Sequence, residues 1–167
     1  MGESDHPDRV ADRACFSMRA IGRRGWLRGS EGMGQTKAKR VVLVVEDDPD
    51  ARRLFEMVAA EEAGLEVVGA RDGQEALYRA SAVQPDVVLL DLMLPRVDGY
   101  EVARRLRADR ATRDAWIVAV TAHGDAGQAI EAGANQVLFK PIAIDDLVLV
   151  LRAATARTRR PRRRATA

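Results

Sequence analysis

Five short apolar runs divide the chain from residue 41 onward, and a stretch with helical spacing of apolar residues follows each run. Runs of this length that are rich in Val and Leu are typical of parallel strands buried on both faces. Alternation of such strands with helices predicts a parallel sheet covered by helices on both sides. The strands are expected at residues 41–45, 65–70, 87–91, 116–120 and 136–139.

Right-handed crossovers leave few arrangements for five parallel strands, and the order 2-1-3-4-5 is natural for a chain of this size. We therefore predict a single three-layer, flavodoxin-like α/β domain over residues 40–156. Asp48, Asp72 and Asp98 stand where helix N-caps are expected, each shortly before a Pro or a Glu that favours the first turn. The helix after Asp48 is expected to bury Leu54, Phe55 and Val58 and to end at Gly64.

Charge is distributed unevenly along the 167 residues. Residues 41–151 hold eleven basic and twenty acidic residues, whereas residues 1–40 have a net charge of +4 and residues 152–167 one of +7. Residues 1–39 lack helical or strand periodicity and are expected to be a flexible extension; translation from Met33 would remove most of it. Residues 157–167 are expected to be a basic disordered tail.

The remaining composition argues against two classes of protein. No apolar run is long enough to cross a bilayer, so membrane insertion is not expected. The single cysteine, Cys15, excludes an internal disulfide, and a cytoplasmic location is the simplest expectation.

Polar residues follow four of the apolar runs at the point where each run ends. Because the carboxyl ends of parallel strands meet at one edge of a sheet, these side chains are expected to gather around the switch point between the first and third strands. They are Glu46 and Asp47 after the first run, Asp91 after the third, Thr121 after the fourth and Lys140 after the fifth.

Three carboxylates placed together repel one another, and a hard divalent cation such as Mg²⁺ would relieve that repulsion. A hydroxyl from Thr121 and an ammonium from Lys140 would suit the anionic oxygens of a phosphoryl group carried by Asp91. Each residue alone also has a simpler interpretation: Asp91 could cap its strand, Lys140 could be solvated, and the acidic pair could form a turn.

Four motifs in this order resemble the receiver domain of two-component response regulators, over about residues 41–155. They are Val-Val-Glu-Asp-Asp-Pro at 44–49, Leu-Leu-Asp-Leu-Met-Leu-Pro-Arg-Val-Asp-Gly at 89–99, Val-Thr-Ala at 120–122 and Lys-Pro at 140–141. The resemblance implies that Asp91 accepts a phosphoryl group from a histidine kinase or a histidine phosphotransfer protein.

The resemblance also implies roles for the residues around Asp91. Asp47, Asp91 and the backbone carbonyl of Met93 would bind Mg²⁺ directly, and Glu46 would act on the metal mainly through water. Thr121 and Lys140 would contact the phosphoryl oxygens. Pro141 would follow a cis peptide bond, which is a minority state for X-Pro.

Two departures from the family pattern are visible. Val137 occupies the fifth-strand position at which the family often has an aromatic residue. The segment between Thr121 and Lys140 is shorter than usual, so the fourth helix is expected to be short.

We considered three functional classes. The first is a stand-alone response regulator that signals through partner proteins and catalyses only its own Mg²⁺-dependent phosphorylation and dephosphorylation, because little sequence follows the last helix. The second is a nucleic-acid-associated regulator acting through the Arg-rich tail; the lack of interleaved aromatic residues disfavours this class. The third, a phosphohydrolase, is disfavoured because Met93 stands where such enzymes carry a second Asp.

Overall fold

The fold is described from a computed structural model, which places residues 39–62, 65–123 and 125–158. The predictions for residues 1–38, for Gly64 and for residues 159–167 lie outside the described residues. Within them, none of the helices is both long and apolar enough to cross a membrane.

Five strands alternate with five helices in the described part of the chain. The strands are β1 (Arg40–Val45), β2 (Leu65–Ala70), β3 (Val87–Asp91), β4 (Trp116–Thr121) and β5 (Gln136–Phe139). The helices are α1 (Pro49–Glu61), α2 (Gly73–Val83), α3 (Gly99–Ala108), α4 (Ala126–Glu131) and α5 (Ile144–Arg157). Helix α5 thus includes Arg157, which the sequence assigned to the tail.

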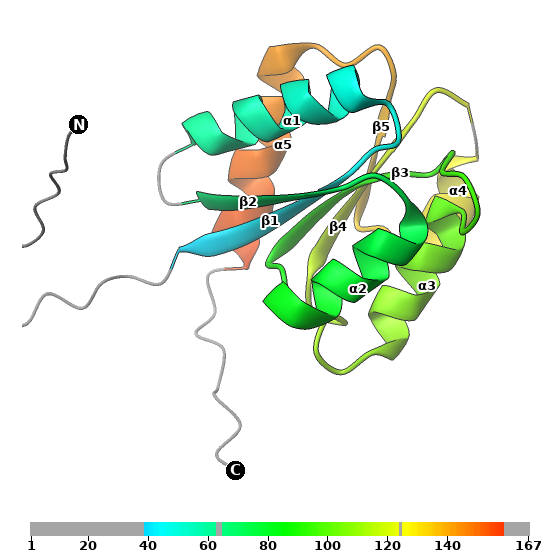
Figure 1. The fold of residues 1–167 in the computed structure, drawn as a ribbon. Helices are drawn as coiled ribbons and strands as arrows, with labels where there is room; N and C mark the ends of the chain where they lie inside the picture. The colour runs from blue at the N-terminus through cyan, green and yellow to red at the C-terminus, as the bar shows by residue number, and fades with distance from the viewer. Residues whose placement is uncertain (1–38, 63–64, 124, 159–167) are drawn as a thin grey trace, which may run out of the picture. The chain divides into compact units, whose positions relative to one another are not determined.

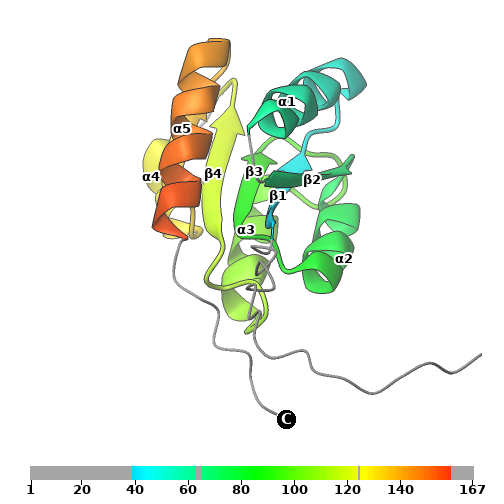
Figure 2. The same cartoon turned by 90° about the vertical axis from the view of Figure 1, so that its left-hand side faces the viewer.

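All strand pairs are parallel, and the sheet has the predicted order β2-β1-β3-β4-β5. Helices α1 and α5 cover one face of the sheet, and α2, α3 and α4 cover the other (Figures 1 and 2). The predicted three-layer α/β fold is therefore confirmed.

Alternate residues of the central strands supply two separate cores. In β1, Val42 and Val44 pack under α1 and α5, whereas Leu43 and Val45 pack under α2 and α3. This period-two alternation with apolar residues on both sides explains why the strand reads as a continuous apolar run.

The three aspartate N-caps are confirmed. Asp48, Asp72 and Asp98 each accept a hydrogen bond from a backbone N–H in the first turn of the following helix. One part of the prediction for the first helix was wrong: Phe55 and Val58 are buried, but Leu54 is exposed. The buried stripe of α1 is completed by Ala59, which places Leu54 at the margin of the stripe.

Candidate functional site

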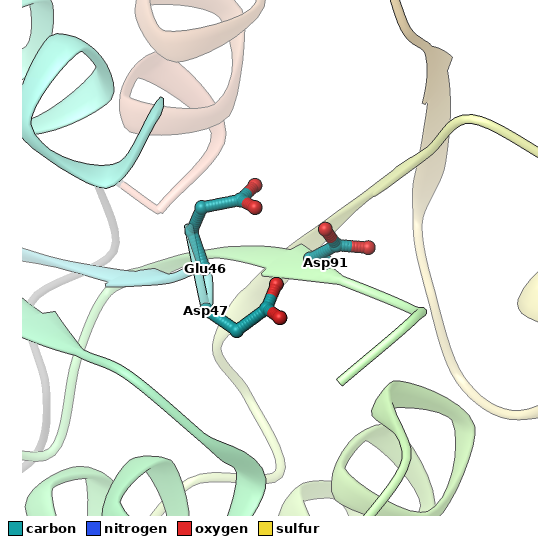
Figure 3. A group of neighbouring side chains, drawn as sticks. All are labelled: Glu46, Asp47 and Asp91. Atoms are coloured by element: carbon teal, nitrogen blue, oxygen red, sulfur yellow. The ribbon is translucent and has the colours of Figure 1, made fainter. Parts of the chain in front are cut away.

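Strands β1 and β3 bring three carboxylates together at the carboxyl edge of the sheet. Glu46 and Asp47 directly follow β1, and Asp91 is the last residue of β3. An oxygen atom from each side chain lies within 4.8 Å of the other two, and Figure 3 shows the three carboxylates converging. Glu46 and Asp91 are buried and Asp47 is exposed, so one side of the cluster is open to solvent.

Lys140 reaches the cluster from the end of β5. Its Nζ lies 2.7 Å from Glu46 Oε2 and 2.7 Å from Asp91 Oδ2, and it donates a hydrogen bond to each. The peptide bond between Lys140 and Pro141 is cis, which confirms the prediction made for Pro141. The ammonium therefore binds two of the three carboxylates directly.

The turn after β3 holds the second oxygen of Asp91. The backbone N–H of Met93 donates to Asp91 Oδ1 at 2.8 Å, and the N–H of Gly99 donates to the Leu92 carbonyl at 3.0 Å. A Cβ atom at position 99 would lie 2.2 Å from the Asp91 carbonyl oxygen, so only glycine allows α3 to begin so close to this strand.

Thr121 lies at the same edge, at the end of β4. It is buried, and its hydroxyl donates a hydrogen bond to the backbone carbonyl of His123. Its own carbonyl accepts a hydrogen bond from the N–H of Lys140 at 2.8 Å, which ties the ends of β4 and β5 together. All the side chains predicted for the site are thus placed at one edge, although among the described residues the Thr121 hydroxyl donates to a backbone carbonyl and to none of the three carboxylates.

Burial and charge determine the protonation of this cluster. The pKa of Glu46 is raised to about 7: burial is the largest cause, the nearby Asp91 carboxylate adds to the rise, and Lys140 acts in the opposite direction. For Lys140, burial lowers the pKa, but the hydrogen bonds and charges of Asp91 and Glu46 outweigh burial and raise it above its ordinary value. One ammonium therefore faces three carboxylates.

The donor set fits a hard divalent cation. Carboxylate oxygens are the ligands that Mg²⁺ prefers, and Mg²⁺ binds one or two of them while keeping several waters. Exposed Asp47 leaves room for such waters, and an added positive charge would offset the excess of carboxylates. Met93, whose N–H holds Asp91, lies beside the cluster, and the role of its carbonyl stays a prediction.

One contact at the site was not predicted from the sequence. The guanidinium of Arg52 donates from Nη1 to the carbonyl oxygens of Glu46, at 2.7 Å, and Asp47, at 3.4 Å. This side chain on α1 therefore fixes the backbone that presents two of the carboxylates. An Arg near the start of a helix carries no distinctive pattern, so this contact could not be predicted from the sequence.

Comparisons with known proteins agree with this geometry. The family model described as "Response regulator receiver domain" matches residues 42–152, more than half of the chain. The DNA-binding dual master transcriptional regulator RpaA of Synechocystis sp. is 38% identical over 122 residues, which cover 71% of this chain and 50% of RpaA. The chain thus spans about half the length of RpaA and of similar transcriptional regulators.

Two solved structures are similar over their whole length. The chemotaxis protein CheY4 of Vibrio cholerae is 28% identical with a TM-score of 0.65, over 70% of this chain and 99% of that chain. The receiver domain of the sensor histidine kinase PA1611 from Pseudomonas aeruginosa PAO1 is 32% identical with a TM-score of 0.65, over 71% of this chain and 99% of that chain. That structure has a magnesium ion coordinated in its active site cleft.

Proposed function

The chain belongs to the response regulator receiver domain family, and we propose that it acts as a phosphorylation switch in which Asp91 accepts a phosphoryl group from a histidine kinase or a histidine phosphotransfer protein. The observation that carries this proposal is the contact of Lys140 Nζ with both Glu46 and Asp91, inside a cluster of three carboxylates. With Mg²⁺ bound at the acidic pair, a buried aspartate between that metal and the Lys140 ammonium would be suited to carry an anionic group.

In the proposed reaction, a carboxylate oxygen of Asp91 attacks phosphorus and forms an acyl phosphate. The bond between phosphorus and the donor's imidazole nitrogen breaks, and the imidazole leaves with the electron pair and takes up a proton. Mg²⁺ bound by Asp47, Asp91 and the Met93 carbonyl, with Glu46 acting through water, would neutralise charge on the transferring group.

Two side chains of the chain would serve the phosphoryl group directly. Lys140, which binds Asp91 Oδ2, is placed to pair with a phosphoryl oxygen on that carboxylate. The Thr121 hydroxyl must leave the His123 carbonyl before it can donate to the phosphoryl group. Phosphorylation would therefore change a hydrogen bond in the segment between β4 and α4, from which we propose that the signal passes to partner proteins in the cytoplasm.

The proposal is tested by the intact mass of the full chain after incubation with Mg²⁺ and phosphoramidate, a small phosphodonor. Wild type is expected to gain the mass of one phosphoryl group, and Asp91→Asn none. Asp98→Asn is the matched control, because Asn also caps the exposed start of α3 and should leave the mass gain intact. A wild type that gains no mass, or an Asp91→Asn variant that gains it, would contradict the proposal.

A second candidate function is nucleic-acid binding through the Arg-rich tail, and the DNA-binding role stated for RpaA favours it. Of the tail predicted from the sequence, Arg157 lies at the end of α5, with its guanidinium 4.9 Å from the centre of the Trp116 ring, and the remainder lies outside the described residues. A DNA affinity of the full chain that falls steeply with salt and is lost on truncation after Thr158 would support this function.

A further inference from the structure

We propose that Arg96 is a positioning residue, which holds the loop between β3 and α3 through an ion pair with Asp72 and thereby sets the geometry for Mg²⁺ beside Asp91. The inference rests on the proposed function, because the cation is the one implied there. It concerns two residues to which the sequence assigned no role at the site: Arg96 had none, and Asp72 was predicted only as an N-cap.

The backbone of Arg96 is in a conformation that needs support. Its φ is +70°, in the left-handed region that residues other than Gly, Asn and Asp seldom adopt. Such a conformation is disfavoured for an ordinary L-residue, because its Cβ atom lies too close to the following carbonyl oxygen. The loop of residues 92–98 therefore depends on contacts outside itself for its shape.

Asp72, at the start of α2, supplies the first of those contacts. This aspartate is buried; its Oδ1 accepts the N–H of Glu75 at 2.8 Å, and its Oδ2 accepts a hydrogen bond from Arg96 Nη2. Arg71 contributes charge from 3.7 Å but makes no hydrogen bond with this carboxylate among the described residues. Because the partner carboxylate is buried and fixed by a helix N-terminus, Arg96 is bound to a rigid acceptor.

Gly73 supplies the second contact. A Cβ atom at this position would lie 2.3 Å from the Val97 carbonyl oxygen, so the first residue of α2 lies directly against the loop. Consecutive residues of the loop, Arg96 and Val97, thus meet the N-cap and the first residue of α2, which are Asp72 and Gly73. The far side of the loop is docked on α2 at two points.

The near side of the same loop is part of the acidic cluster. Met93 donates its N–H to Asp91 Oδ1, and its carbonyl is the backbone ligand implied for Mg²⁺. The hydrogen bond from Gly99 to Leu92 closes the base of the loop. With the base closed, the Arg96–Asp72 ion pair restrains residues 93–97 together with the Val97–Gly73 contact and the burial of Leu94 in the core, and Mg²⁺ tolerates little deviation from octahedral geometry.

The test compares Arg96→Gln and Asp72→Asn, singly and combined, with wild type. Gln keeps much of the length of Arg without its charge, and Asn keeps the N-cap acceptor of Asp72 while removing the ion pair. The matched control is Arg104→Gln, which removes an exposed arginine that pairs with Glu101 at 3.5 Å on α3. Urea unfolding confirms that each variant is folded, and Arg96→Asn, which is uncharged and tolerates the left-handed backbone, replaces Arg96→Gln if that variant is not.

Two measurements on the full chain give the outcome: the Mg²⁺ dissociation constant from calorimetry, and the phosphorylation rate with phosphoramidate as a function of Mg²⁺. We expect each single variant to weaken Mg²⁺ binding about tenfold, as loss of a residue that orients a metal ligand does. The double variant should be no weaker than the single ones, and the rate at saturating Mg²⁺ should stay within about twofold of wild type. Arg104→Gln should match wild type.

Unchanged Mg²⁺ binding in both single variants, or effects that add in the double variant, would overturn the inference. If wild type binds Mg²⁺ and gains a phosphoryl group while Arg96→Gln behaves in the same way, only the role of Arg96 fails. If wild type binds no Mg²⁺ and gains no phosphoryl group, the proposed function fails and the inference fails with it.

Discussion

Two half-buried cations lie near opposite ends of β5. Lys140 belongs to the candidate site, whereas Arg107 is a structural clamp, which ties α3 to the residues before β4 and β5. Lys140, after the strand, donates to the carboxylates of Glu46 and Asp91. Arg107, at the end of α3, donates to uncharged oxygens that precede β4 and β5: the carbonyls of Gly133 (2.8 Å), Arg113 (2.8 Å) and Ala115 (2.7 Å), and Asn135 Oδ1 (2.6 Å).

The difference lies in the charge that remains. Around Arg107, hydrogen bonds are satisfied without any carboxylate acceptor among the described residues, and burial lowers its pKa. Around Lys140, one ammonium faces three carboxylates, so negative charge remains in excess. The hydrogen bonds of Arg107 are satisfied within the protein, whereas the excess negative charge around Lys140 favours the binding of a cation.

The largest expected effect is a loss of stability when Arg107 is replaced. Arg107→Met should lower the free energy of unfolding by about 3 kcal/mol, because it leaves the part-buried carbonyls of Gly133 and Ala115 without this donor. Urea denaturation measures the loss. Arg113→Met, which removes an exposed side chain 4.0 Å from Asp114, should cost less than about 0.5 kcal/mol. Equal losses in the two variants would show that Arg107 is not a clamp.

The contacts of Arg107 are an example of what could not be predicted from the sequence. Helix starts at Asp48, Asp72 and Asp98 and the strand-end residues of the site were predictable, because capping and strand ends leave local patterns. Arg107 has acceptors 6, 8, 26 and 28 residues away, and no local pattern announces such contacts. The predicted burial of Leu54 was wrong for a related reason: apolar character alone did not show where the buried stripe of α1 is centred.

Neither the left-handed backbone of Arg96 nor its ion pair with Asp72 could be predicted from the sequence. A left-handed backbone is signalled by Gly or Asn, not by Arg. Its partner Asp72 was fully explained as an N-cap, and only the fold shows that the second carboxylate oxygen faces another loop. The residues predicted from the sequence are those that the motifs carry, and the residues missed are those that hold the motifs in place.

The next effect concerns pH at the acidic cluster. The pKa of Glu46 is raised to about 7 in the folded chain, so the folded state binds a proton more tightly than the unfolded state does. The stabilisation is complete below the ordinary pKa of Glu and is lost as pH rises through about 7. Between about pH 5 and pH 8, the metal-free protein should lose about 2 kcal/mol of stability.

Urea denaturation at both pH values measures this loss, and Glu46→Gln is the control, because Gln does not titrate. The variant should show a much flatter dependence on pH over this range. The lowered pKa values of Asp72 and Glu75 act at lower pH and do not contribute there. A wild type that is equally stable at both pH values would show that Glu46 is ionised throughout.

The smallest expected effect is on Mg²⁺ affinity, and it is an increase, whereas removal of a site residue usually lowers affinity. Lys140→Met should tighten Mg²⁺ binding about tenfold, because the ammonium repels the metal and competes for the same carboxylates. Calorimetry measures the change, and Lys39→Met, an exposed lysine before β1, should leave it unaffected. Weaker binding in Lys140→Met would show that the ammonium organises the carboxylates more than it competes with the cation.

The central claim is that Asp91 carries the phosphoryl group. The most direct measurement treats the full chain with phosphoramidate and Mg²⁺, reduces the product with borohydride, and locates homoserine by peptide mass spectrometry, because hydride reduces an acyl phosphate but not a free carboxylate. We expect Mg²⁺-dependent conversion of Asp91 to homoserine, with Asp47 and Glu46 unchanged. Homoserine at another acidic position, or none at Asp91, would contradict it.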